Sequence, residues 1–148
     1  MNEGGGRGYS GDLSAREAWN LLAEVPNATL IDVRTLAEWS FVGVVDLSPL
    51  GKEPVLLEWQ SFPSKQPNPD FVPTLLAELS RRQIGDDAPL LFLCRSGGRS
   101  AAAAHTVTAA GRGHCYNVAG GFEGDLDADR HRGRLGGWKA ETLPWIQS

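Results

Sequence analysis

The stretch that decides the fold runs from residue 89 to residue 104 and reads Pro-Leu-Leu-Phe-Leu-Cys-Arg-Ser-Gly-Gly-Arg-Ser-Ala-Ala-Ala-Ala. Its first part, Pro89 to Leu93, is the most hydrophobic run in the chain and predicts a buried central strand that ends at Cys94. Residues 95–98 predict a loop, and residues 99–110 predict a helix that Gly111 closes. A strand, a loop and a helix in this order are the building unit of parallel α/β sheets.

Similar units lie on both sides of this stretch. Ser14 is placed to cap a helix that runs to Val25, with Glu17 completing a capping box. Strands are predicted over residues 29–33, 55–59 and 114–118, and a second long helix over residues 71–82. Shorter elements are expected in three places: one or two helical turns over 35–40, a short strand or buried turn over 41–47, and a short helix over 138–146 that Pro144 breaks. The alternation predicts an α/β fold whose mostly parallel sheet of about five strands carries helices on both faces.

Composition places the chain among ordinary globular proteins. It has 148 residues, of which 41% are hydrophobic and 22% charged, so one domain over residues 12–148 is expected after a flexible, glycine-rich lead-in over residues 1–11. Its net charge of −4 argues against a protein that binds nucleic acid by neutralising phosphates. No apolar run is long enough to span a membrane. Without the apolar core of a signal peptide, a cytoplasmic location with free thiols is the expectation.

The loop that follows Cys94 has the composition of an anion site. Ligands of open α/β sheets bind at the carboxyl ends of strands, and a helix N-terminus offers unpaired amide groups and a partial positive charge. Gly97 and Gly98 allow successive amide groups to turn inward, while Arg95 and Arg99 add two positive charges. We expect this setting to favour a nucleophilic thiolate at Cys94 and to hold an anionic substrate beside the sulfur.

The alternative for Cys94 is a buried structural cysteine beside a simple glycine turn, because free cysteine is often buried. Two arginines, two glycines and two serines within the next six residues favour a functional cysteine instead. Phosphatases and arsenate reductases of the tyrosine-phosphatase type use Cys-x5-Arg, whereas Arg99 stands at the fifth position after Cys94 and Ser100 at the sixth. The shorter loop favours a smaller centre, such as a persulfide sulfur or the outer sulfur of thiosulfate.

Two motifs, a Gly-Gly pair and a Gly-Trp pair stand in an order known from one family. The first motif is Leu30-Ile31-Asp32-Val33-Arg34 with Glu38-Trp39, and the second is Cys94-Arg95-Ser96-Gly97-Gly98-Arg99-Ser100. Gly120-Gly121-Phe122 and Gly137-Trp138 follow. In these segments, from about Leu13 to Trp145, the chain resembles the single-domain rhodaneses, the thiosulfate sulfurtransferase family. It departs from many members over residues 41–47, where their Gly-His-Ile-Pro-Gly-Ala segment is absent.

The resemblance implies a rhodanese-like fold and a ping-pong sulfur transfer. Cys94 would attack the outer sulfur of thiosulfate, release sulfite and pass the persulfide sulfur to cyanide or a thiol. Loop amide groups would stabilise the persulfide. Arg95 and Arg99 would bind the sulfonate end of the donor. Hydroxyl groups of the loop would add donors, although that of Ser100 has the alternative of capping the helix. The residues expected to bind substrate are Arg95, Ser96, Gly97, Gly98, Arg99 and Ser100, and no cofactor or metal is expected.

Several roles stay open at this point. Asp32 and Arg34 are supporting residues, either orienting the active loop or, as we favour, forming a structural ion pair. Cys115 is either a resolving thiol or, more in keeping with its strand, a buried core cysteine. Residues 123–136 form a flap or, as favoured, a surface loop. An alternative to the thiosulfate enzyme is a carrier that receives persulfide sulfur from a partner protein and hands it on to another.

Overall fold

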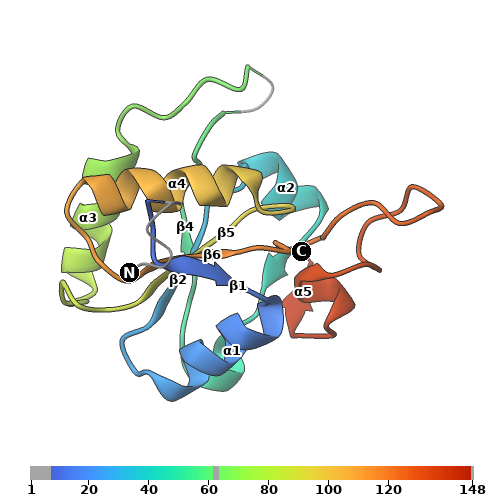
Figure 1. Ribbon diagram of the computed structural model, residues 1–148, viewed down its shortest axis with the longest axis horizontal. Coiled ribbons are helices and arrows are strands. Elements are labelled where there is room, and N and C mark those ends of the chain that lie inside the picture. Colours follow the sequence, from blue (N-terminus) through green and yellow to red (C-terminus); the bar gives the residue numbers. More distant parts are fainter. Residues whose placement is uncertain (1–7, 62–63, 148) are drawn as a thin grey trace.

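The computed structural model describes residues 8–61 and 64–147, and its centre is a five-stranded sheet (Figure 1). The strand order is β1-β6-β5-β2-β4, and every neighbouring pair is parallel. The strands are β1 (Gly11–Leu13), β2 (Thr29–Asp32), β4 (Val55–Leu56), β5 (Leu90–Leu93) and β6 (Cys115–Val118). This confirms the predicted α/β class and puts β5 at the middle of the sheet.

Helices cover both faces of the sheet (Figure 1). α3 (Phe71–Arg81) and α4 (Gly98–Ala109) pack on one face, and α1 (Ala15–Glu24) and α5 (Gly137–Ala140) on the other. Because successive side chains of a strand alternate, Leu91 and Leu93 join the core under α1, while Phe92 and Cys94 join the core under α4. Cys94 is thus fixed by the central strand on the α4 face.

Capping boxes start α1 and the short helix α2 (Leu36–Phe41). At α1 the Ser14 hydroxyl accepts from the Glu17 amide, and the Glu17 carboxylate accepts from the Ser14 amide, as predicted. Thr35 and Glu38 repeat the arrangement at α2. The α2 helix follows β2 directly, so its first turn lies at the carboxyl edge of the sheet.

The structure differs from the predictions at the two ends of the chain. Gly11, expected to close the flexible lead-in, begins edge strand β1, where the Ser10 amide donates to the Cys115 carbonyl; residues 1–7 of that lead-in lie outside the described residues. The prediction of one helix over 138–146 is wrong beyond α5. Trp145–Ile146 instead form β7, which pairs antiparallel with β3 (Val44–Val45).

Two smaller differences concern the middle of the chain. The strand predicted over 55–59 is reduced to the two residues of β4, and a single 3-10 turn, η2 (Ser48–Leu50), precedes it. Within residues 8–61 and 64–147, no helix has the length and apolar character needed to cross a membrane.

Candidate functional site

Cys94 lies directly beyond β5, with only 1% of its surface exposed. Its Sγ accepts a hydrogen bond from the Gly97 amide at 3.1 Å and lies 3.2 Å from the Ser100 hydroxyl. α4 begins at Gly98, so the loop predicted over 95–98 wraps its backbone around the sulfur. The amide groups of Arg95, Ser96 and Gly98 have no acceptor among the described residues. The sulfur therefore lies in a loop whose backbone still has amide donors available for a bound anion.

The loop is held by the glycine turn after β6. Gly97 has φ +115°, and a Cβ there would collide with the Ala119 carbonyl oxygen. From the other side, the Phe122 amide donates to the Cys94 carbonyl at 2.8 Å, and the Glu123 amide to the Arg95 carbonyl at 2.9 Å. The bracing role of this turn was not predicted from the sequence, although its glycine pair was recognised.

Arg99 is engaged in an ion pair that the sequence did not reveal. Its two terminal nitrogens donate to the two carboxylate oxygens of Glu38 at 2.7 and 2.9 Å. Burial opposes ionisation of Glu38, but hydrogen bonds from Arg99 and Thr35 and the charge of Arg99 outweigh it and lower the pKa of the Glu38 carboxyl. The hydrogen bonds to Glu38 in turn raise the pKa of Arg99. The charge of Arg99 is therefore largely balanced before any substrate arrives.

A pocket of about 710 Å³ opens over this loop. Its lining includes four basic side chains, namely Lys65, Arg95, Arg99 and Arg132, together with the acidic Glu38 and Glu123 and the exposed ring of Phe41. With Arg99 and Glu38 paired, Arg95 is the exposed arginine of the Cys94 loop that faces this space. The pocket is in the size range that accepts drug-sized ligands, about 300–1,000 Å³, and so has room for more than a small inorganic anion.

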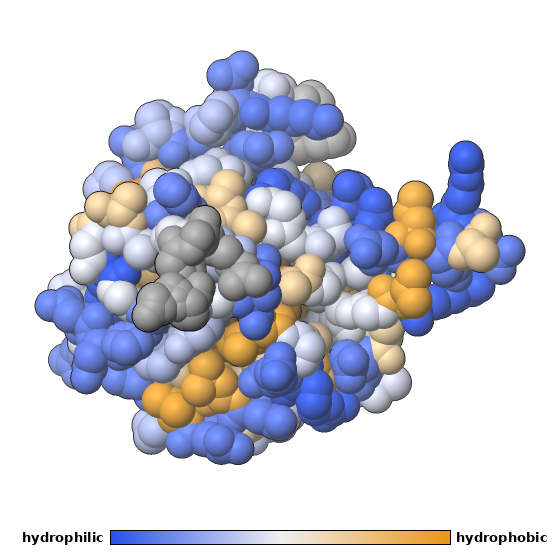
Figure 2. Space-filling model, in the orientation of Figure 1, coloured by the Kyte–Doolittle hydropathy of each residue, from blue (hydrophilic) through white to orange (hydrophobic). Residues whose placement is uncertain are grey.

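Residues 123–136 contribute to one wall of that pocket through Glu123 and Arg132. The Arg132 guanidinium donates to the Gly124 carbonyl, which fixes the base of the segment. The rest projects from the body of the protein, and Figure 2 shows hydrophobic side chains on the projection, where Leu126 and Leu135 are about half exposed. The segment is therefore a surface loop whose base reaches the pocket.

Asp32 and Arg34 form a completely buried ion pair at the carboxyl end of β2. Arg34 donates to both Asp32 oxygens, with the shortest contact at 2.7 Å, and also to the Gly43 carbonyl. Its guanidinium stacks over the Phe122 ring at 4.3 Å. This is the structural ion pair favoured from the sequence, and it anchors the segment that follows Gly121.

Ser100 is the third residue of α4 and does not cap it, since Gly97 occupies the N-cap position. Its buried hydroxyl instead contacts Cys94 and the Asn117 side chain on β6. Asn117 was not predicted as a site residue; its only sequence signal is a polar side chain within a hydrophobic strand. Cys115 is fully buried, and burial raises the pKa of its thiol, in keeping with a core cysteine.

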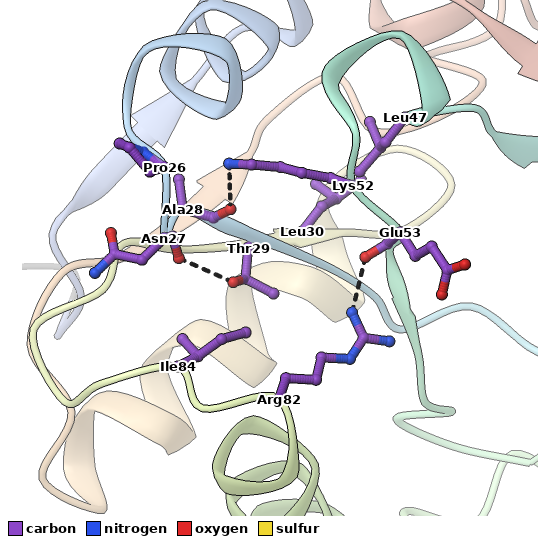
Figure 3. Close-up of a pocket in the computed structure, with 10 residues that line it drawn as sticks. All are labelled: Pro26, Asn27, Ala28, Thr29, Leu30, Leu47, Lys52, Glu53, Arg82 and Ile84. Atoms are coloured by element: carbon purple, nitrogen blue, oxygen red, sulfur yellow. Dashed lines mark hydrogen bonds between the residues drawn. The ribbon is translucent and has the colours of Figure 1, made fainter.

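A second pocket, of about 160 Å³, lies at the amino ends of the strands, away from Cys94 (Figure 3). There the Lys52 ammonium donates to the carbonyl groups of Leu22, Val25 and Ala28, and Arg82 donates to the Glu53 carbonyl. The two cations that line this pocket are thus engaged by backbone carbonyl groups, and Lys52 closes the end of α1. We therefore assign it a structural role.

Fold and site together define a parallel α/β domain with a cysteine in an amide-lined, arginine-bearing loop. The model of the rhodanese-like domain family matches residues 14–128, and the chain belongs to that family. It is 37% identical over 134 residues to the uncharacterized protein RC0915 of Rickettsia conorii, covering 90% of this chain and 95% of that protein.

Solved structures of other proteins are also similar to this chain. The crystal structure of Rv0390 from M. tuberculosis is 49% identical, with a TM-score of 0.81 over 95% of this chain and 99% of that one. The polysulfide-sulfur transferase homodimer of Wolinella succinogenes is 26% identical, with a TM-score of 0.56 over 93% of this chain and 78% of that one. Family and neighbours support a sulfurtransferase.

Proposed function

We propose that the protein moves sulfane sulfur from thiosulfate, or from a persulfide donor, to a thiophilic acceptor such as cyanide or a thiol. The observation that carries this proposal is the position of Cys94 Sγ, 3.1 Å from the Gly97 amide, inside a loop in which the amides of Arg95, Ser96 and Gly98 have no acceptor within the part of the chain that the structure describes. Such donors stabilise charge on a sulfur that is buried away from water.

The chemistry takes two displacements. The Cys94 thiolate attacks the outer sulfur of thiosulfate, the sulfur–sulfur bond of the donor breaks, and sulfite leaves with the bonding electron pair. The acceptor then attacks the terminal sulfur of the Cys94 persulfide, and the Cys94 thiolate leaves. The loop amides hold the negative charge of the persulfide between the two steps.

The choice of donor is tested by comparing turnover with thiosulfate and with polysulfide, using cyanide as acceptor and thiocyanate as the product measured. Thiocyanate formation from thiosulfate supports the thiosulfate enzyme. Loading of Cys94 by polysulfide without thiosulfate turnover would favour the sulfur carrier instead. The roomy pocket and the likeness to a polysulfide-sulfur transferase support this second candidate.

Arg95 is proposed to bind the sulfonate end of the donor, because it faces the pocket and Arg99 is already paired with Glu38. Replacing Arg95 by alanine should raise the KM for thiosulfate about tenfold, the value of one charge-assisted hydrogen bond, with a much smaller change in kcat. The measurement is steady-state kinetics at fixed ionic strength.

Arg81→Ala is the matched control, since it removes the same charge from an exposed pair with Glu78 at the end of α3. Its KM should stay within about twofold of wild type, because exposed, distant charges are screened. Equal changes in KM for the two variants would show that Arg95 acts only through net charge and does not contact the donor.

A further inference from the structure

The Ser100 hydroxyl stands between two groups that compete for its one proton. It is fully buried, with its Oγ 3.2 Å from Cys94 Sγ and 2.6 Å from the Oδ1 of Asn117. The Asn117 side chain continues to Asp12, donating through its Nδ2 at 3.1 Å, and Asp12 also accepts from the Tyr9 hydroxyl. A chain of contacts thus leads from the buried sulfur to the exposed edge of the sheet.

Asp12 sets the donor–acceptor direction of these hydrogen bonds. The parallel register of β1 and β6 places Asp12 directly beside Asn117. An ionised carboxylate can only accept hydrogen bonds, so the amide nitrogen of Asn117 must face Asp12 and its carbonyl oxygen must face Ser100. That oxygen also only accepts. The Ser100 hydroxyl is placed to donate to either Oδ1 of Asn117 or Sγ of Cys94, but the contact to Oδ1 is the shorter, 2.6 Å against 3.2 Å. The Ser100 proton therefore lies on the Asn117 side, and the sulfur faces the lone pairs of the hydroxyl.

We propose that Asn117, oriented by Asp12, is a positioning residue that holds the Ser100 proton away from the sulfur of Cys94. This rests on the proposed function and names a residue that tunes it. A Cys94 thiol fits the arrangement, because its S–H can donate to Ser100. A thiolate does not fit, because Ser100 must give up its 2.6 Å bond to Asn117 before it can donate to the sulfur.

The persulfide relieves this conflict. Its negative charge resides on the outer sulfur, so the inner sulfur bonded to Cβ makes little demand on Ser100, and the bond to Asn117 remains. The Ser100–Asn117–Asp12 chain, which we call the hydroxyl relay, thereby disfavours the free thiolate relative to the sulfur-loaded enzyme. It would restrain unloaded Cys94 from reacting with other electrophiles.

Other charged groups act on Cys94 but do not use Ser100. Arg99 interacts with it electrostatically while paired to Glu38, Asp32 and Arg34 pair with each other on β2, and Arg95 extends from the loop. These groups set the background field, which is the same whether or not Ser100 is present. Comparing variants with and without Ser100 therefore separates the effect of the hydroxyl relay on Cys94 from the effect of these charges.

The test is alkylation of Cys94 by iodoacetamide as a function of pH, read by mass spectrometry of the cysteine-bearing peptides. Four forms are compared: wild type, Asn117→Ala, Ser100→Ala and the double variant. Asn117→Ala frees the Ser100 proton for the thiolate, so the alkylation midpoint should fall by about one pH unit, making the rate below the midpoint about tenfold higher. In the Ser100→Ala background, adding Asn117→Ala should produce no shift.

An unchanged midpoint in Asn117→Ala, or the same shift with and without Ser100, would overturn the proposal. Asp12→Asn is the second variant, because it lies on the exposed edge strand and spares the core. It releases the orientation of the Asn117 amide and also removes one negative charge, so it should lower the midpoint in the same direction. The shift should be larger when Ser100 is present than in the Ser100→Ala background, where only the change of charge acts. Alkylation needs no sulfur donor, so this result is independent of whether thiosulfate is the substrate.

Discussion

The Cys94→Ser variant is expected to lose sulfur transfer by at least about a thousandfold in kcat. Serine keeps the size of the side chain and can still accept from the Gly97 amide, so the loop should retain its shape. Its hydroxyl does not ionise near neutral pH and forms no stable bond to sulfane sulfur, so both displacements lose their nucleophile. Thiocyanate formation from thiosulfate and cyanide measures the loss.

Cys115→Ser is the matched control for this variant. It changes the other thiol of the chain, which lies in β6 with its sulfur directed toward the carbonyl groups of Arg112 and Gly113. It should keep most of the activity, at some cost in stability because a hydroxyl enters the core. Retained turnover in Cys94→Ser, or loss of turnover in a folded Cys115→Ser, would show that Cys94 is not the nucleophile.

The Asp32→Ala variant should lower the free energy of unfolding by about 3–5 kcal/mol, the cost of leaving one partner of a buried ion pair alone. Arg34 is fully buried, so its charge would face the core without a counterion. Its Nη1 already has no hydrogen-bond partner within the described part of the chain. Urea unfolding followed by circular dichroism measures the change.

Glu141→Ala provides the comparison for an exposed ion pair. Its carboxylate lies 3.9 Å from Arg16, with 41% and 49% of the two side chains exposed. Exposed pairs contribute little, so this variant should cost less than about 1 kcal/mol. If the two variants were equally stable, burial of the Asp32–Arg34 pair would not be what stabilises this end of β2.

Local signals explain which elements could be predicted. The hydrophobic run before Cys94 and the Ser14–Glu17 capping box each hold, within a few residues, the interactions that form the strand or start the helix. Both elements were predicted correctly. Strand β1 has no such signal, because Gly11-Asp12-Leu13 is short and begins with a glycine; it forms by pairing with β6. The same holds for β3 and β7, which stabilise each other from distant parts of the sequence.

The candidate site divides in the same way. The cysteine, the glycines and the arginines of the loop are contiguous, so the sequence alone pointed to an anion site around Cys94. Their partners are not contiguous. Glu38 reaches Arg99 only because α2 follows β2 at the same sheet edge, and Asn117 reaches Ser100 only because β6 lies beside β5 under α4. Tertiary structure, which no local pattern encodes, pairs these residues.

The most direct test of sulfur transfer through Cys94 is the mass of the intact protein after incubation with thiosulfate, followed by peptide mapping. One added sulfur on the peptide that contains Cys94, removed by cyanide and absent from Cys94→Ser, is the expected result. No added sulfur from thiosulfate or polysulfide, or sulfur found only on Cys115, would contradict a Cys94 persulfide as the carrier.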